Sequence, residues 1–168
     1  SFPTRRSSDL YGGPVAAKAF INVNPSNYDR VVILGPSHFE YFHGCGLTSF
    51  DKFETPFGYV DVDTSTVRNL LSDSKNFFSF PQSSDVQEHS IEMEIPFLKY
   101  IFDKKPFSIV PMVVGDGDLN KNIKLVKCLY NLYEDPRTLF VISSDFCHWG
   151  QNFDYVYYIF EKNLKYIY

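Results

Sequence analysis

Two histidines of this chain directly follow runs that predict strands, and side chains of α/β proteins gather into sites at such strand ends. His38 comes shortly after the apolar run at residues 30–35, and His148 comes three residues after Asp145, which closes the run at 138–144. A neutral imidazole can bind a metal or transfer a proton near neutral pH, and a neighbouring carboxylate can orient it. These residues predict a polar cleft able to hold a metal.

A third histidine, His89, lies next to Glu88 and three residues before Glu92. Its segment allows a second interpretation, in which residues 88–92 only begin a helix whose first acidic residues are favoured by the helix dipole. Similar alternatives hold for the other two segments, because a histidine after a strand can bond within its own loop and Asp145 can bond nearby backbone amides. Three such segments at one edge of a sheet favour a shared cleft, but they do not select a reaction.

The elements that must position these residues alternate along the chain as strand, helix and strand. Uninterrupted β-branched or aromatic runs predict buried strands, and amphipathic stretches predict helices. The predicted strands cover residues 30–35, 107–115 and 138–145, a further strand pair lies within 44–62, and the predicted helices cover 14–21, 63–72, 89–102 and 119–133. Such an order predicts an α/β fold with a mainly parallel central sheet flanked by helices, in which segments 31–35, 108–114 and 138–144 are adjacent central strands.

Composition and charge exclude several classes of protein. The chain has 168 residues and a net charge of −4, with no basic run, so it lacks the basic surface of a nucleic-acid-binding protein. No apolar stretch reaches the length of a membrane-spanning helix. The three cysteines, Cys45, Cys128 and Cys147, form no Cys-x-x-Cys pair, which favours a reducing compartment over a disulfide framework.

The first ten residues, SFPTRRSSDL, differ in composition from the rest of the chain. They contain two of the five arginines and no Ile, Asn, Lys or Tyr. We therefore predict that residues 1–10 are a non-native or artefactual segment. Residues 11–168 are then expected to be part of one α/β domain.

Three segments of the chain together resemble the Memo family, the mediators of cell motility. They are residues 33–38 (ILGPSH), 88–93 (EHSIEM) and 143–150 (SSDFCHWG). The resemblance implies a fold similar to the class III extradiol (LigB-type) dioxygenases, here incomplete. In those non-haem iron enzymes two histidines and one glutamate hold Fe(II), and another histidine acts as acid/base. The resemblance further implies that Memo proteins keep the cleft, use a Cys in place of the carboxylate ligand, and bind copper or iron.

The resemblance also assigns roles to individual residues. His38 matches a metal-ligand histidine of the family. His148 matches the histidine that is the acid/base in the dioxygenases, and Asp145 lies beside it. His89 and Glu92 match positions that shape or support the cleft. The catalytic candidates are therefore His148, Asp145 and His89, and the metal-ligand candidate is His38.

Two of the three metal ligands that the resemblance implies have no counterpart in this chain. The first belongs to a His-Ala-Gly-Tyr motif, which would fall on residues 6–9, where the sequence reads RSSD. The second, the Cys, would lie beyond Tyr168. Since a selective site needs several ligands in fixed geometry, we expect this chain to bind copper or iron only weakly and to be inactive as given.

The resemblance implies a metal-binding redox or signalling effector, with phosphotyrosine peptides or signalling proteins as partners. Its expected location is the cytoplasm, with the nucleus as a second compartment. Two alternatives stay open. One is a non-haem, metal-dependent oxidoreductase resembling the dioxygenases and acting on a small aromatic substrate. The other is a peptide-binding module that uses the cleft without a metal.

Overall fold

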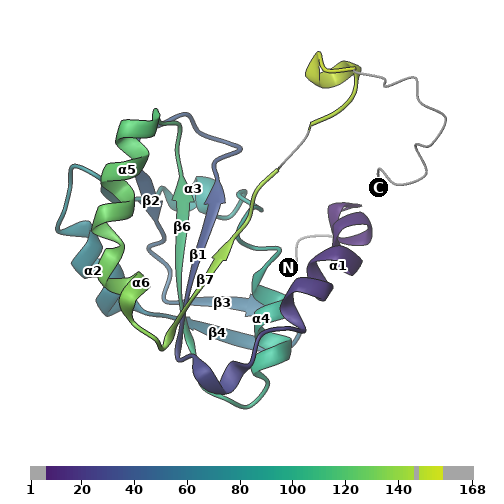
Figure 1. Ribbon diagram of the computed structural model, residues 1–168, viewed down its shortest axis with the longest axis vertical. Helices are drawn as coiled ribbons and strands as arrows, with labels where there is room; N and C mark the ends of the chain where they lie inside the picture. The colour runs from purple at the N-terminus through teal and green to yellow at the C-terminus, as the bar shows by residue number, and fades with distance from the viewer. Residues whose placement is uncertain (1–6, 146–147, 157–168) are drawn as a thin grey trace.

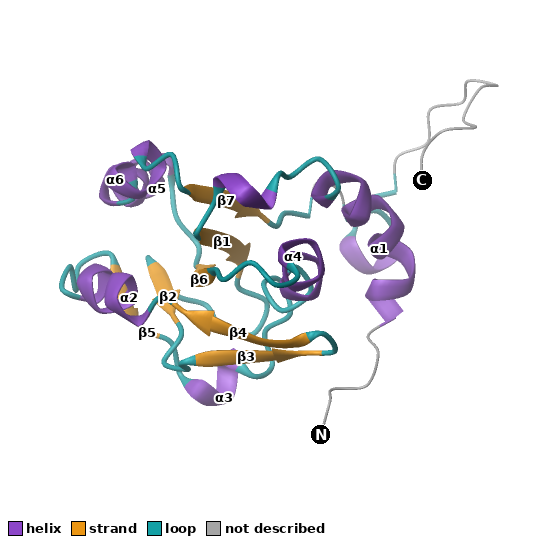
Figure 2. Cartoon of the chain, turned by 90° about the horizontal axis from the view of Figure 1, so that it is seen from below, coloured by secondary structure: helices purple, strands orange, loops and turns teal. Residues whose placement is uncertain are grey.

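The computed structural model describes residues 7–145 and 148–156, in which helices cover both faces of one sheet (Figure 1). Helices α2, α5 and α6 lie on one face, and α1 and α4 lie on the other (Figure 2). The helices are α1 (Ser7–Phe20), α2 (Thr64–Leu71), α3 (Gln82–Asp85), α4 (Ile95–Phe102), α5 (Leu119–Cys128) and α6 (Tyr130–Glu134), with the 3₁₀ helices η1 (Pro25–Asn27) and η2 (Gln151–Phe153). The strands are β1 (Arg30–Pro36), β2 (Cys45–Leu47), β3 (Lys52–Thr55), β4 (Gly58–Val62), β5 (Phe77–Ser79), β6 (Ser108–Val114) and β7 (Thr138–Ile142). None of the helices in these described ranges combines the length and the apolar character needed to cross a bilayer.

The sheet is mostly parallel, as the sequence predicts. Its strand order is β3-β4-β6-β1-β7, and β2 pairs with β6 and β5. Strand β1 is parallel to both β6 and β7, and β4 is parallel to β6, whereas the β3–β4 hairpin and the β2–β6 pair are antiparallel. Val31, Val32 and Ile33 of β1 are fully buried between the helical layers. A continuous apolar run is what a strand covered on both faces requires.

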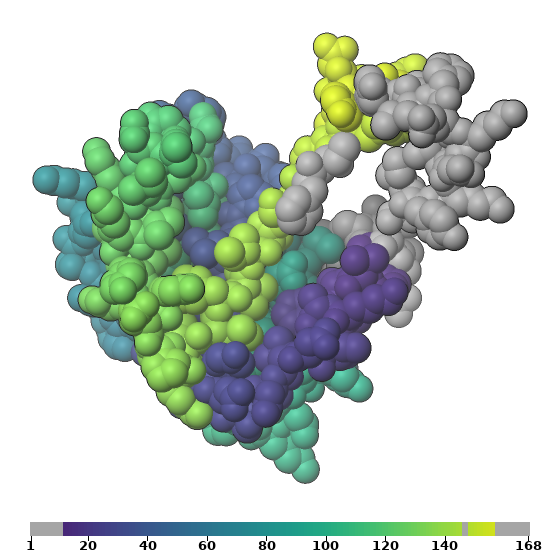
Figure 3. All heavy atoms as spheres, in the orientation of Figure 1, coloured from purple at the N-terminus to yellow at the C-terminus, as the bar shows by residue number. Residues whose placement is uncertain are grey.

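Strand β7 is adjacent to β1 as predicted, but it is an edge strand within the described part of the chain rather than a central one. Burial falls along it, from the buried Thr138 at its start to Ile142 at its end, which is 71% exposed. The described residues after Asp145, 148–156, stand off from the helices and strands in the space-filling view (Figure 3). An apolar run therefore identifies a strand without showing how completely the strand is covered.

Several helices begin or end differently from the predictions, and proline explains one case. Turns occupy residues 90–94, and α4 begins only at Ile95, so that Pro96 is the second residue of the helix. A proline there costs no intrahelical hydrogen bond, whereas in the interior it would remove one. The helix predicted at 119–133 is divided at Leu129 into α5 and α6.

Helix α1 begins before the predicted start at Pro14. It extends back to Ser7 and includes Pro14 in its interior. The proposed boundary between an artefactual segment and the domain at residue 10 stays a prediction.

The carboxyl end of β1 lies against the segment that precedes α4. A Cβ added at Gly35 would lie 2.5 Å from Oγ of Ser90 and 3.1 Å from Cγ1 of Ile91, so a glycine allows this close approach. Ile91 is itself buried in the core. This packing holds Glu88 and His89 beside the end of β1, where His38 follows.

Candidate functional site

His38 lies two residues beyond β1, with its imidazole between two carboxylates. Its Nδ1 is 2.8 Å from Oε1 of Glu88, and its backbone N–H donates to Oε2 of the same carboxylate at 2.7 Å. Its other ring nitrogen, Nε2, is 3.3 Å from Oδ2 of Asp145. The Glu88 side chain is buried, whereas that of Asp145 is 48% exposed. The imidazole of His38 therefore contacts a buried carboxylate through one nitrogen and a solvent-exposed carboxylate through the other.

Asp145 reaches His38 because β7 and β1 are parallel neighbours. The backbone N–H of Ser143, just after β7, donates to the carbonyl oxygen of Leu34 in β1 at 2.8 Å, which places the following residues at the same edge as His38. The same Oδ2 atom of Asp145 is 3.5 Å from Nε2 of His148. Asp145 therefore contacts both imidazoles.

His89 contacts the site through the face of its ring. Its imidazole stacks on that of His38, with ring centroids 4.3 Å apart and planes 24° from parallel. Its Nδ1 is 3.9 Å from Oε1 of Glu88. This stacking fixes the plane of the His38 ring.

The charges of these groups support one another. Burial alone would lower the pKa of His38. Its hydrogen bonds to Glu88 and Asp145 raise the pKa by more than burial lowers it, so the pKa of His38 lies above its ordinary value. Burial raises the pKa of Glu88, but hydrogen bonds donated by the backbones of His38, Ser90 and His89 and by the His38 ring bring it down to about 2. Glu88 is therefore ionised near neutral pH. Its negative charge favours a positive charge on the His38 ring or on a cation at the opposite ring nitrogen, Nε2.

The structure brings the four predicted site residues, His38, His89, Asp145 and His148, into one contiguous group. Their catalytic and metal-ligand roles stay predictions. Glu88 is the site residue whose contacts the sequence does not predict, since a carboxylate beside a helix start has the pattern of a capping residue. The adjacent His89 was the one signal that could have indicated it.

The donor atoms of this group define where a metal would fit. His38, Glu88 and His89 offer ligand atoms that all lie within 4.8 Å of one another. However, stacked imidazoles direct their in-plane lone pairs along nearly parallel planes, so two such rings cannot easily bind one ion. The outer side of His38 is more suitable, because Nε2 and Oδ2 of Asp145 are 3.3 Å apart. Ligand atoms that share one ion at about 2.1 Å lie roughly 3 Å apart, so this pair could bind the same ion.

The described cysteines lie away from this group. Cys45 belongs to β2, and burial raises its pKa to about 12. Cys128 ends α5, and its thiol donates to Oδ2 of Asp73. Cys147 lies outside the described residues. No metal-ligand role follows for Cys45 or Cys128.

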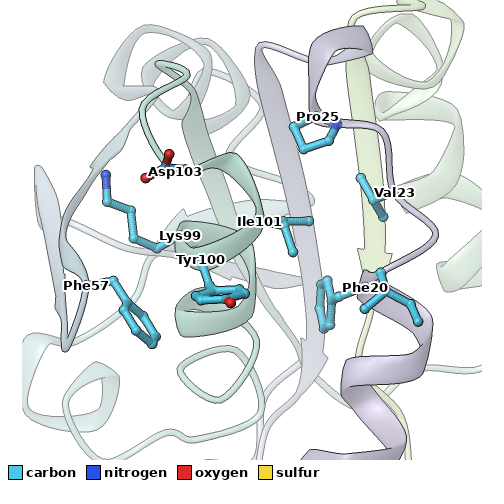
Figure 4. A pocket seen from close by; sticks show the side chains of 9 residues that line it. Phe20, Val23, Pro25, Phe57, Lys99, Tyr100, Ile101 and Asp103 are labelled. Atoms are coloured by element: carbon cyan, nitrogen blue, oxygen red, sulfur yellow. The ribbon is translucent and has the colours of Figure 1, made fainter.

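A surface pocket of about 730 Å³ also lies apart from the histidines. It is near the amino ends of β1 and β6, with Ile101 of α4 between Tyr100 and Phe20 (Figure 4). The residues that line it are Phe20, Ile21, Val23, Pro25, Phe57, Lys99, Tyr100, Ile101 and Asp103. No histidine lines the pocket, so its volume does not identify the site.

Comparison with known proteins adds independent information. The family model described as Memo-like protein matches residues 8–167. The chain is 40% identical to Protein memo-1 homolog of Caenorhabditis elegans over 86% of its length and 41% of the relative's. It is 39% identical to Protein MEMO1 of Rattus norvegicus and of Homo sapiens, in each case over 88% of its length and 50% of the relative's. The chain thus spans about half the length of these relatives or less, and it belongs to the Memo-like protein family.

Proposed function

We propose that this chain carries part of a copper- or iron-binding site, with His38 as a ligand through Nε2. The observation that supports this is the contact between Nδ1 of His38 and the buried carboxylate of Glu88, at 2.8 Å. A histidine that binds a metal usually donates its second ring N–H to a carboxylate, a backbone carbonyl or water, and Glu88 is such a carboxylate. When bound beside Nε2, copper or iron would supply redox chemistry.

The other residues of the site complete the proposal. Asp145 offers a carboxylate oxygen beside Nε2 of His38 and is the second donor. His148 lies on the exposed side of Asp145, with its Nε2 3.5 Å from the same carboxylate oxygen, and is the proposed acid/base residue. With two protein donors, water would fill the remaining coordination positions, so binding by this chain is weak.

A redox or signalling role in the cytoplasm or nucleus, and partners such as phosphotyrosine peptides or signalling proteins, are proposals that rest on the family. A dioxygenase-like reaction on a small aromatic substrate and a metal-free peptide-binding role have the same basis. The contacts of His38 favour the metal-binding proposal.

Calorimetric titration of the chain with Cu²⁺ tests this assignment. We expect weak binding with one ion per chain, lost in His38→Ala. His43→Ala is the matched control, because His43 is exposed and bonds the carbonyl oxygen of Asp116, away from the site. Tight binding that persists in His38→Ala, or binding that His43→Ala removes, would overturn the assignment.

A further inference from the structure

Glu88 is a buried carboxylate with an unusually complete set of hydrogen bonds. Only 3% of its surface is exposed. Its Oε1 accepts from the backbone N–H groups of His89 and Ser90 at 2.8 and 3.0 Å, and it lies 2.8 Å from Nδ1 of His38. Its Oε2 accepts from the backbone N–H of His38 at 2.7 Å. One side chain thus joins the end of β1 to the segment before α4.

The position of the Glu88 carboxylate beside Nδ1 determines which nitrogen of a neutral His38 ring carries hydrogen. Two carboxylates face the His38 ring, and an ionised carboxylate can only accept hydrogen bonds, so the single hydrogen of a neutral ring goes to the closer and better buried partner. That partner is Glu88, 2.8 Å from Nδ1, whereas Asp145 is 3.3 Å from Nε2 and 48% exposed. When the imidazole is neutral, its lone pair is then on Nε2, which faces Asp145. A half-turn of the ring, which would exchange the two nitrogens, would have to disrupt the stacking against His89.

We propose that Glu88 is a positioning residue that holds His38 in the tautomer with hydrogen on Nδ1, so that Nε2 is presented to the metal. The value of this tautomer for metal binding rests on the proposed function. The tautomer itself is a property of the metal-free chain and can be measured there.

A purely structural role for Glu88 is the competing explanation, since three backbone N–H groups also donate to it. The variant Glu88→Gln separates the two roles. Its amide retains one acceptor oxygen and nearly the same volume, but it lacks the charge and can donate to Nδ1. Glu54→Gln is the matched control, because Glu54 is exposed on β3.

The experiment is a long-range ¹H–¹⁵N correlation spectrum of the metal-free chain with ¹⁵N-labelled histidine, recorded where His38 is neutral. We expect hydrogen on Nδ1 in the wild type and in Glu54→Gln. In Glu88→Gln the ratio of the Nδ1–H to the Nε2–H tautomer should fall roughly tenfold, because a charge-assisted hydrogen bond is lost. A wild type with hydrogen on Nε2 would overturn the proposal even if the variant failed to fold. An unchanged ratio in folded Glu88→Gln would overturn it as well.

A second measurement separates this proposal from the proposed function. Titration with Zn²⁺ should show an affinity about 10–100-fold lower in Glu88→Gln than in the wild type, as is typical when a carboxylate behind a ligand histidine is lost. If Zn²⁺ binding does not depend on His38 at all, the proposed metal site fails while the tautomer result still stands. If binding needs His38 but Glu88→Gln leaves the affinity unchanged, positioning by Glu88 is wrong and the metal site stands.

Discussion

Gly35 positions the site by having no side chain. The end of β1 approaches the segment before α4 so closely that a Cβ on Gly35 would lie 2.5 Å from Oγ and 2.8 Å from Cβ of Ser90. Both residues are buried, so neither can move into solvent. The distance between His38 and Glu88 therefore depends on how closely the backbone at Gly35 approaches Ser90.

The substitution Gly35→Ala tests this. We expect the free energy of unfolding to fall by about 1–3 kcal/mol, because added volume in a packed interior forces neighbouring groups apart. Urea denaturation provides the measurement. The control is Gly12→Ala in α1, where a Cβ would meet no atom within 4 Å, and it should not destabilise the chain. Equal stability of the wild type and Gly35→Ala would show that the segment before α4 adapts freely.

The sequence predicts the four site residues but not the contact that connects them to the interior. His38, Asp145 and His148 are predictable because each lies just beyond a strand, and parallel strands bring those ends together. Glu88 is not predictable in this way. Its partner His38 is 50 residues away in the sequence, and a capping carboxylate would have the same local pattern.

At the scale of elements, α2 and β1 are joined through Asp63. Its Oδ1 accepts from the backbone N–H of Thr66 at 3.0 Å, which caps the helix, and its Oδ2 accepts from Nε of Arg30 in β1 at 2.8 Å. One side chain thus performs two functions that substitutions can separate.

We predict that Asp63→Ala destabilises the chain by about 1 kcal/mol more than Asp63→Asn. Asparagine can still cap α2, whereas alanine loses both the cap and the ion pair with Arg30. Chemical denaturation of the two variants checks this difference. Equal losses would mean that the ion pair alone accounts for the contribution of Asp63.

Element types were more predictable than element boundaries. The strands β1, β6 and β7 and the helix α2 follow from apolar runs and from a capping residue. The start of α4 does not, because the apolar periodicity continues backward from Pro96 through residues that form turns. Strand β5 also escapes prediction, since three residues are too few for a period to appear.

At the scale of the whole molecule, the buried carboxylate of Glu88 and the half-buried carboxylate of Asp63 make stability depend on pH. The folded pKa of Glu88 is about 2, below its ordinary value of 4.5, and the pKa of Asp63 is also lowered. A carboxyl group with a depressed folded pKa binds fewer protons in the folded state than in the unfolded state. Its contribution to stability is therefore complete above about pH 4.5 and is lost as the pH falls toward 2.

We therefore expect the urea concentration at the unfolding midpoint to fall steeply between about pH 4.5 and 2. Glu88→Gln should flatten this dependence, because the variant has no carboxyl group to protonate at that position. Glu54→Gln should retain the slope of the wild type. A slope that is the same in wild type and Glu88→Gln would indicate that Glu88 is protonated equally in both states.

The chain spans about half the length of its Memo-like relatives or less. Within its described residues, the proposed site has two metal donors, Nε2 of His38 and Oδ2 of Asp145. The most direct test of the proposed site is anomalous diffraction from crystals of the chain soaked with Zn²⁺. We predict a peak about 2.0–2.1 Å from Nε2 of His38, on the side that faces Asp145. A peak on the opposite side, among His38, Glu88 and His89, or a zinc ion bound elsewhere with none at His38, would contradict the account.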